Sequence, residues 1–306
     1  MTRPDPPGSS LAALVSFGRA LLATGGSGVL AHLVSVEGSH YRRPGARMIL
    51  CEDGSSAGSI SGGCLESELR RRVPEVLAAK GPVLVEYDLS GADDIVFGSG
   101  LGCGGRIGVL LTELDAAELA GLERAAQTSP AAVLLLAGSG EDLLPLARIG
   151  KIVGWRVEVV APRVTPRAIR RWAAVLESPI RTPDEIDSVV TSSTAAVVAT
   201  HHYLDDIEML RALRATNPFY IGLLGSRGRA ARMLEDTGDA PDPRGLARIH
   251  APAGLDIESE TPEEIALSIA AEIQAVLRGR RGGFLRDRET AIHERPSSRR
   301  PAARAG

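Results

Sequence analysis

Two glycine-rich loops in the first third of the chain each carry one cysteine. The first reads Gly-Ser-Ile-Ser-Gly-Gly-Cys-Leu-Glu over residues 58–66, and the second reads Gly-Ser-Gly-Leu-Gly-Cys-Gly-Gly over residues 98–105. Glycines at this density let the backbone turn tightly and approach a ligand closely. The third cysteine of the chain, Cys51, ends an apolar run and is expected to be inert. Cys64 and Cys103 are therefore the candidates for thiolate chemistry.

The two loop cysteines precede different predicted elements. Residues 65–72 are predicted to form a helix, so Cys64 would lie at a helix N-terminus, where the macrodipole and free N–H groups favour a thiolate. Residues 106–112 are predicted to form a strand, so a thiolate at Cys103 would need a nearby cation such as Arg42 or Arg106. The alternative is that both cysteines are small buried side chains beside tight turns.

A second group of candidate residues comes after the predicted strands of the second half. Gly225-Ser226-Arg227 comes directly after one strand and opens a helix. Backbone N–H groups, a hydroxyl and a guanidinium together suit a phosphate, although a simple turn with a surface arginine would have the same sequence. His201 and His202 follow another strand, with Asp205 and Asp206 close behind. These residues permit a metal site, and a helix-capping or solvent-exposed histidine is the alternative.

The segment Gly138-Ser139-Gly140 occupies the place where a Rossmann domain seats the phosphates of a dinucleotide. The third glycine of that fingerprint is replaced by Leu143, and Glu141 and Asp142 would repel a pyrophosphate unless one of them points away. The next predicted strand, at 156–160, is followed by Ala161-Pro162-Arg163 and lacks at its end the acidic residue that holds a ribose hydroxyl. NAD(P) binding is therefore not expected here.

The hydrophobic pattern predicts two domains of different type. Through residue 126, strands without a strand–helix–strand rhythm predict a mixed α+β domain. From residue 130 to residue 278, strands and helices alternate, which predicts a doubly wound Rossmann-like α/β domain. The strands are expected at 28–36, 47–51, 82–88, 106–112, 131–137, 156–160, 195–200 and 219–224. The helices are expected at 11–23, 65–72, from the Gly138–Gly140 turn to about residue 153, and at 166–176, 204–215, 228–234 and 261–277.

Two local signals set helix boundaries. Pro74 should kink or break the helix that begins at residue 65 near Val73, because proline clashes with the preceding turn. Thr261-Pro262-Glu263-Glu264 has a capping threonine, a proline at the first helical position and an acid at the third, so it should begin the last helix.

Composition and charge narrow the functional classes. The 306 residues are 44% hydrophobic and 24% charged, which is typical of a globular protein of about two domains. No apolar run approaches the roughly 20 residues that span a bilayer. Residues 279–306 hold eight arginines against three acids and are expected to be a disordered basic tail, so the rest of the chain is more acidic than the net charge of −3 indicates. Nucleic acid is an unsuitable partner for such a body, and three cysteines without framework spacing indicate a reducing cytoplasm.

Several uncommon motifs in one order make the chain resemble the XdhC/CoxI family, whose members are accessory factors for xanthine dehydrogenase and related molybdenum hydroxylases. The motifs are the two cysteine loops, Gly38-Ser39-His40-Tyr41-Arg42-Arg43-Pro44-Gly45-Ala46, Tyr220-Ile221-Gly222-Leu223-Leu224-Gly225-Ser226-Arg227, Arg248-Ile249-His250-Ala251-Pro252 and Gly254-Leu255-Asp256-Ile257. The resemblance implies a maturation factor, not a catalyst. Such a factor binds molybdenum cofactor transiently, as molybdopterin or its cytosine dinucleotide, and delivers it to a hydroxylase of the xanthine, aldehyde or CO dehydrogenase type.

The resemblance also implies a cysteine desulfurase as a further partner, and we expect a homodimer. The residues expected to bind cofactor are Arg42, Ser61, Gly62, Gly63, Cys64, Glu66, Gly102, Cys103, Gly104, His201, Gly225, Ser226, Arg227 and His250. No catalytic residue or metal ligand is assigned. Two other functions remain open, namely an NAD(P)-dependent oxidoreductase and a subunit that binds a molybdenum hydroxylase without touching cofactor.

Overall fold

The computed structural model describes residues 11–38, 42–63, 65–79, 81–88, 105–128, 132–238 and 243–288. The chain divides into two compact units, with the first boundary after Ala125 and the second unit running from Ala126 to Gly282. Among the described helices, none combines the length and the apolar character that a bilayer span requires.

The first unit is built on a five-stranded antiparallel sheet with the strand order β3-β2-β1-β5-β4. Its strands are β1 (Gly28–Gly38), β2 (Arg47–Cys51), β3 (Ser56–Gly58), β4 (Val83–Asp88) and β5 (Gly105–Glu113). Side chains of alternate residues along each strand enter opposite faces, so Val29 and Ala31 pack in one apolar cluster and Leu30 in another. The sheet is therefore buried on both faces over much of its area.

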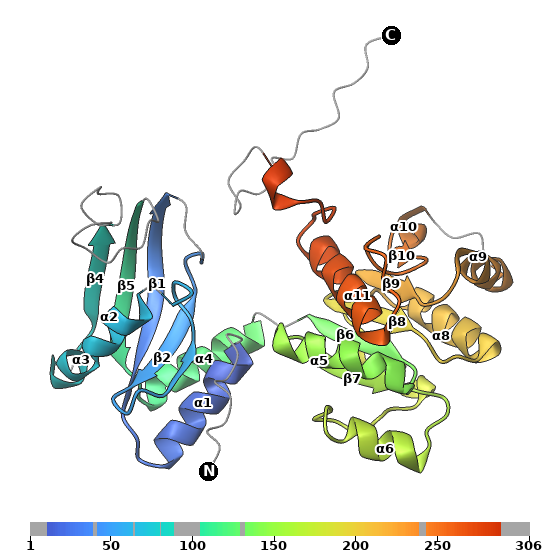
Figure 1. Ribbon diagram of the computed structural model, residues 1–306. Helices are drawn as coiled ribbons and strands as arrows, with labels where there is room; N and C mark the ends of the chain where they lie inside the picture. Colours follow the sequence, from blue (N-terminus) through green and yellow to red (C-terminus); the bar gives the residue numbers. More distant parts are fainter. Residues whose placement is uncertain are drawn as a thin grey trace, which may run out of the picture. The chain divides into compact units, whose positions relative to one another are not determined.

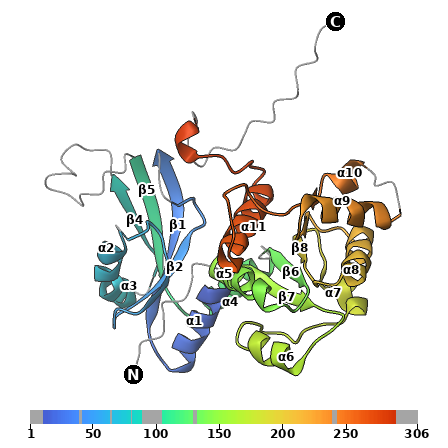
Figure 2. The same cartoon turned by 45° about the vertical axis from the view of Figure 1, so that its right-hand side comes forward.

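The two faces of this sheet are covered by the described helices α1 (Leu11–Ala23), α2 (Glu66–Arg71), α3 (Val73–Ala79) and α4 (Ala116–Thr128). α2 and α3 pack on one face, and α1 and α4 on the other (Figures 1 and 2). The predicted break at Pro74 is confirmed, because α2 ends at Arg71. Proline is tolerated in the first turn of a helix, so α3 starts again at Val73, which the sequence pattern did not predict.

The second unit contains a five-stranded parallel sheet with the order β10-β9-β8-β6-β7. Its strands are β6 (Val133–Ala137), β7 (Arg156–Val160), β8 (Thr194–Val198), β9 (Tyr220–Leu223) and β10 (Ile249–His250). All residues of β6, β8 and β9 are buried, as in a sheet covered on both faces. The strand order reverses between β6 and β8, so the carboxyl ends of these two strands flank the switch point of the fold.

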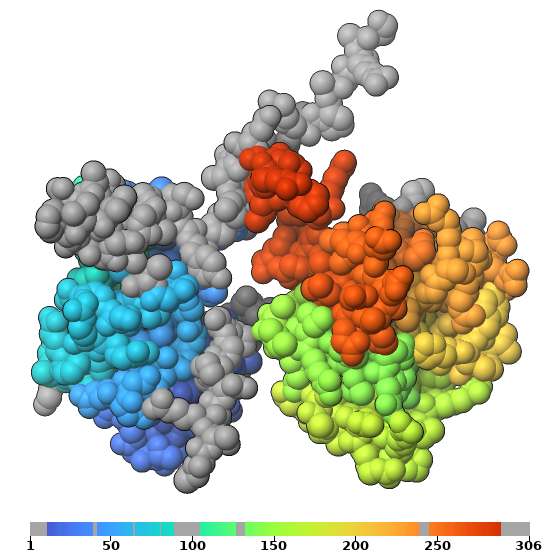
Figure 3. Space-filling model, viewed as in Figure 1, coloured from blue at the N-terminus to red at the C-terminus, as the bar shows by residue number. Residues whose placement is uncertain are grey.

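Helices lie on both faces of the parallel sheet, which confirms the predicted doubly wound Rossmann-like fold (Figure 1). α5 (Leu144–Ile152), α6 (Pro166–Trp172) and α11 (Pro262–Leu277) cover one face, where α11 lies beside α5 in the space-filling view (Figure 3). The other face carries α7 (Ile186–Val189), α8 (Tyr203–Ala215) and α9 (Arg227–Asp236). Short elements complete the unit: η2 (Glu141–Leu143), η3 (Pro183–Glu185) and α10 (Pro243–Leu246).

Two features at the end of the described chain bear on the sequence predictions. The capping box of α11 is present, with the hydroxyl of Thr261 accepting from the backbone N–H of Glu264. Beyond α11, the short helix η4 (Leu285–Asp287) follows Phe284, whose side chain is 70% exposed. Residues 289–306 of the expected basic tail lie outside the described residues.

Candidate functional site

The first glycine-rich loop is folded around the carboxylate of Glu66. This side chain is buried at the start of α2 and accepts hydrogen bonds on both oxygens. The donors are the hydroxyls of Ser59 and Ser61 and the backbone N–H groups of Ile60, Ser61, Gly62 and Gly63, at 2.5–3.1 Å. Gly62 and Gly63 have φ angles of 82° and 123°, which allow the backbone to wrap around the carboxylate. Glu66 therefore determines the shape of the loop from inside.

These hydrogen bonds determine the ionisation state of Glu66 and engage the N–H groups of the loop. Burial alone would raise the pKa of Glu66, but the hydrogen bonds from Ser61 and Ser59 outweigh burial and lower the pKa to about 2. The carboxylate is thus ionised at neutral pH, and its negative charge takes up the N–H groups that would otherwise attract an anion. The exposed surfaces of Gly62 and Gly63 are presented outward by the loop, immediately before position 64.

Of the three cysteines, only Cys51 lies within the described residues. Cys64, Cys103 and the neighbouring Gly102 and Gly104 lie outside the described residues. The helix predicted after Cys64 is present as α2, which begins at Glu66.

The remaining residues considered for thiol chemistry are described. Cys51 is a free thiol that is 2% exposed, and burial raises its pKa, in agreement with an inert role. Arg106 forms an ion pair with Asp88 at 2.9 Å, whereas the half-buried Arg42 lies just before β2 with no hydrogen-bond or ion-pair partner among the described residues.

In the second unit, the turn after β6 forms one side of the switch point. Gly138 has a φ of 143°, and a Cβ at this position would lie 2.2 Å from the carbonyl oxygen of Ala199. Only glycine allows the turn to pass this close to the end of β8. Gly140 is also crowded, but by side chains, since a Cβ there would meet Oδ1 of Asp142 and lie 3.1 Å from Nε2 of His201.

His201 therefore occupies the approach over Gly140 that a pyrophosphate uses in dinucleotide-binding domains. Its Nε2 atom lies 3.0 Å from each carboxylate oxygen of Asp142, and its backbone adopts a left-handed conformation with φ at 62°. The other carboxylate of the turn, Glu141, points away and pairs with Arg167 at 2.7 Å. This self-contained arrangement argues against a dinucleotide phosphate at the turn.

His202 faces a different carboxylate from His201. Its Nδ1 atom lies 3.1 Å from Asp205, which also binds the guanidinium of Arg163 at 3.1 Å. Because the two histidines turn to separate carboxylates, they do not converge on one point. Within the described ranges, no group of three His, Cys, Asp or Glu side chains is arranged to hold a metal ion.

The turn after β9 keeps one arginine free. Ser226 caps α9 by accepting a hydrogen bond from the backbone N–H of Arg229. The Arg229 guanidinium binds the buried carboxylate of Asp206 and lies 5.1 Å above the Tyr203 ring, so it is part of the packing between α8 and α9. Arg227 is exposed and has no partner among the residues that the structure describes. The turn thus offers a cation at a helix N-terminus.

His250, at the end of β10, belongs to an internal network. Its ring stacks on the fully buried Tyr220 at 4.3 Å, and its Nδ1 atom lies 3.0 Å from Glu272 of α11. Glu272 also accepts hydrogen bonds from the Tyr220 hydroxyl at 2.6 Å and the backbone N–H of Gly254 at 2.8 Å. Burial raises the pKa of Glu272, but the hydrogen bonds from His250 and Tyr220 outweigh it, so the net shift is downward. His250 therefore ties β10 to α11 and to the loop between them.

The structure places three of the predicted site residues at one edge of the parallel sheet. His201 follows β8, Arg227 follows β9 and His250 ends β10, and these strands are neighbours in the sheet. Glu272 was not recognised from the sequence, and neither were the pairings of Asp142 with His201 and of Asp206 with Arg229, because each pair joins different elements and no local spacing marks it.

These features define a class of two-domain protein, in which an antiparallel-sheet unit with a glycine-rich loop accompanies a Rossmann-like unit without a dinucleotide grip. The model of the XdhC and CoxI family matches residues 21–88, and the model of the XdhC Rossmann domain matches residues 134–273. The chain belongs to the XdhC and CoxI family.

Relatives with established names extend over most of the chain. The chain is 30% identical to a protein of Bacillus subtilis that is named as a probable subunit of xanthine dehydrogenase, over 83% of this chain and 94% of that protein. It is 27% identical to PaoD of Escherichia coli, named a molybdenum cofactor insertion chaperone, over 86% of this chain and 87% of PaoD. A crystal structure described as a xanthine dehydrogenase from Bacillus halodurans matches with a TM-score of 0.75 and 28% identity, over 89% of this chain and 97% of that one.

Proposed function

We propose that this protein is a maturation factor that binds molybdenum cofactor and delivers it to a molybdenum hydroxylase. The observation that carries the proposal is the free, exposed Arg227 beside the Ser226 cap, at the carboxyl edge of the Rossmann-like sheet. An anionic pterin phosphate needs N–H donors and a guanidinium, which this turn supplies. Similarity to a named cofactor insertion chaperone over most of both chains supports the same function.

The first unit carries candidate contacts of its own to the cofactor. Its glycine-rich loop, shaped by Glu66, presents Gly62 and Gly63 next to Cys64. We assign the thiolates of Cys64 and Cys103 to the molybdenum end of the cofactor, because thiolates are soft ligands. We assign Arg42 to the same site as a further cation. Glu66 acts on the loop and not on the cofactor.

The proposal also covers the form of the bound cofactor, the cellular compartment, the partners and the oligomeric state. The cofactor is bound transiently, as molybdopterin or its cytosine dinucleotide, in a reducing cytoplasm. A molybdenum hydroxylase receives it, and a cysteine desulfurase supplies sulfur for the metal. We expect the factor itself to be a homodimer, which light scattering of the purified protein measures.

The two alternative functions would place different requirements on the turns after β6 and β9. An NAD(P)-dependent oxidoreductase would need the Gly138–Gly140 turn for a pyrophosphate, and His201 with Asp142 opposes this. A subunit that only contacts the hydroxylase would need no free cation at the end of β9. The proposed function is therefore tested by the ligand that the protein carries.

We expect protein purified anaerobically from cells that make the cofactor to release a fluorescent oxidised pterin. The same preparation should show no NAD(P)-dependent turnover. Each preparation is boiled and oxidised to release the pterin. Protein from cells unable to synthesise the pterin is the control and should release none. Robust NADH oxidation without recovered pterin would contradict the proposal and favour the oxidoreductase.

A further prediction separates the cysteines. Cys64→Ser or Cys103→Ser should lower activation of the client hydroxylase while the fold survives, since serine lacks a thiolate ligand. Cys51→Ser is the matched control and should leave activation unchanged. In the wild-type protein, Cys51 should react slowest with iodoacetamide because it is buried and its thiol pKa is raised. Client activation equal to that of wild type in all three variants would show that the glycine runs serve backbone geometry alone.

A further inference from the structure

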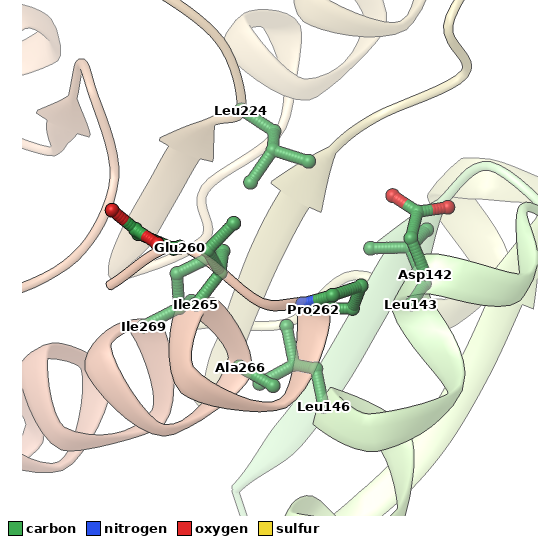
Figure 4. A pocket seen from close by; sticks show the side chains of 9 residues that line it. All are labelled: Asp142, Leu143, Leu146, Leu224, Glu260, Pro262, Ile265, Ala266 and Ile269. Carbon is green, nitrogen blue, oxygen red and sulfur yellow. The ribbon is translucent and has the colours of Figure 1, made fainter.

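An apolar pocket lies at the carboxyl edge of the parallel sheet, between the start of α5 and the start of α11. Leu143 and Leu146 line it from one side, Ile265 and Ala266 from the other, and Leu224 closes the top (Figure 4). Ligands of open α/β sheets bind outside the carboxyl ends of the strands, which is where this pocket opens. The proposed cofactor phosphate turn begins at the residue after Leu224, so pocket and turn are continuous along the chain.

The pocket carries negative charge at its ends and no positive charge in its lining. Figure 4 shows Asp142 at one end and Glu260 at the opposite end. Asp142 is held in place by His201, with both carboxylate oxygens 3.0 Å from Nε2. A phosphate is therefore repelled from this pocket, whereas a group that donates N–H bonds is attracted. The exposed Arg227, three residues after Leu224, attracts a phosphate instead.

The size of the pocket limits what can enter. Its volume is about 90 Å³. A cavity that encloses benzene measures roughly 150 Å³, so this pocket can take one six-membered ring only if one edge of the ring stays outside. Apolar walls suit the faces of such a ring, and a carboxylate at the end of the pocket can accept from an edge that carries N–H groups.

We propose that this pocket binds an aminopyrimidine ring of the cofactor, with Asp142 accepting its N–H donors and the phosphate lying at the Gly225–Arg227 turn. The inference rests on the proposed function and adds the orientation of the ligand along the sheet edge. Two parts of the cofactor have this ring chemistry, namely the pterin and the cytosine of the dinucleotide form. Both have flat faces and an exocyclic amino group.

Two stable probes distinguish the sources of the ring. Binding of 6-hydroxymethylpterin to the full-length protein is followed by quenching of the pterin fluorescence, and binding of cytidine, which like the pterin probe has no phosphate, is followed by calorimetry. Tighter binding of the pterin assigns the pocket to the pterin ring, and tighter binding of cytidine assigns it to the cytosine. If neither probe binds, the proposal is overturned.

Matched variants test the role of the pocket. Asp142→Asn should weaken binding of the tighter probe roughly tenfold, because it removes a charged acceptor. Glu141→Gln removes the same charge from the adjacent residue, whose side chain pairs with Arg167, and should change binding less than roughly twofold. Ala266→Leu fills the pocket and should abolish binding, provided that thermal melting shows an intact fold.

The result separates this inference from the function on which it rests. If wild-type protein releases pterin and the Asp142→Asn variant releases as much with unchanged probe affinity, the pocket assignment is refuted and the function stands. If wild-type protein releases no pterin, the function itself fails. Unchanged probe binding in a folded Ala266→Leu variant also refutes the pocket.

Discussion

Replacing Glu66 with glutamine is expected to lower the free energy of unfolding of the first unit by about 3 kcal/mol at pH 7. The native carboxylate accepts from four backbone N–H groups and two hydroxyls. The glutamine NH₂ group would face some of these donors and leave them unsatisfied in a buried place, which costs about 1–3 kcal/mol each. Thermal or urea unfolding of wild type and variant measures the difference.

The control for this experiment lies on the same helix. Glu68 forms ion pairs with Arg71 and Arg72, but its side chain is 30% exposed and its partners are three and four residues away. Surface pairs of this kind contribute about 0–1 kcal/mol, so Glu68→Gln should change stability little. Equal stability of the Glu66→Gln variant and wild type would show that the loop does not depend on this carboxylate.

The Glu66 contribution should also depend on pH. The folded-state pKa is about 2, below the ordinary value of 4.5, so the stabilisation is fully present above pH 4.5 and is lost as the pH falls toward 2. The difference in stability between wild type and Glu66→Gln should therefore shrink over this range. A difference that stays constant down to pH 2 would contradict the assignment of the low pKa.

The second large effect is expected for Arg227→Ala, which should weaken cofactor binding by roughly 10- to 100-fold. Arg227 is exposed and has no partner among the described residues, so its loss should not affect folding. Binding is measured as the pterin recovered from anaerobically purified protein and as probe affinity.

Two other arginines serve as controls for Arg227. Arg163→Ala removes a guanidinium that is already paired with Asp205, and Arg232→Ala removes an exposed charge farther along α9. Both should reduce binding much less than Arg227→Ala, because neither lies at the strand-to-helix turn. Affinity of the Arg227→Ala variant equal to wild type would place the phosphate elsewhere.

Much of the fold could be read from the sequence because its signals are local. Buried strands such as β2 and β7 have the bounds that their apolar runs predict, and the Thr261 capping box begins α11 as expected. The helix α4 was missed although Asp115 caps its first N–H groups at 2.8 Å. The strands β3 and β10 have three and two residues, which is too short for any periodic pattern.

The candidate site likewise has a part that the sequence predicted and a part that it did not. The sequence alone predicted which residues follow each strand, because turns and helix caps are recognised from a few adjacent residues. It placed His201 after β8 and Arg227 after β9, at the edge where open sheets bind ligands.

The roles of those residues were decided only by the tertiary structure. His201 meets Asp142 from 59 residues away, and Arg229 meets Asp206 from 23 residues away, so Arg227 and not Arg229 is left free. The role of Glu66 depends equally on a loop conformation that brings six donors to one carboxylate. Local sequence sets the backbone preferences of each segment, but the pairing of charges depends on which strand ends and loops the folded chain brings together.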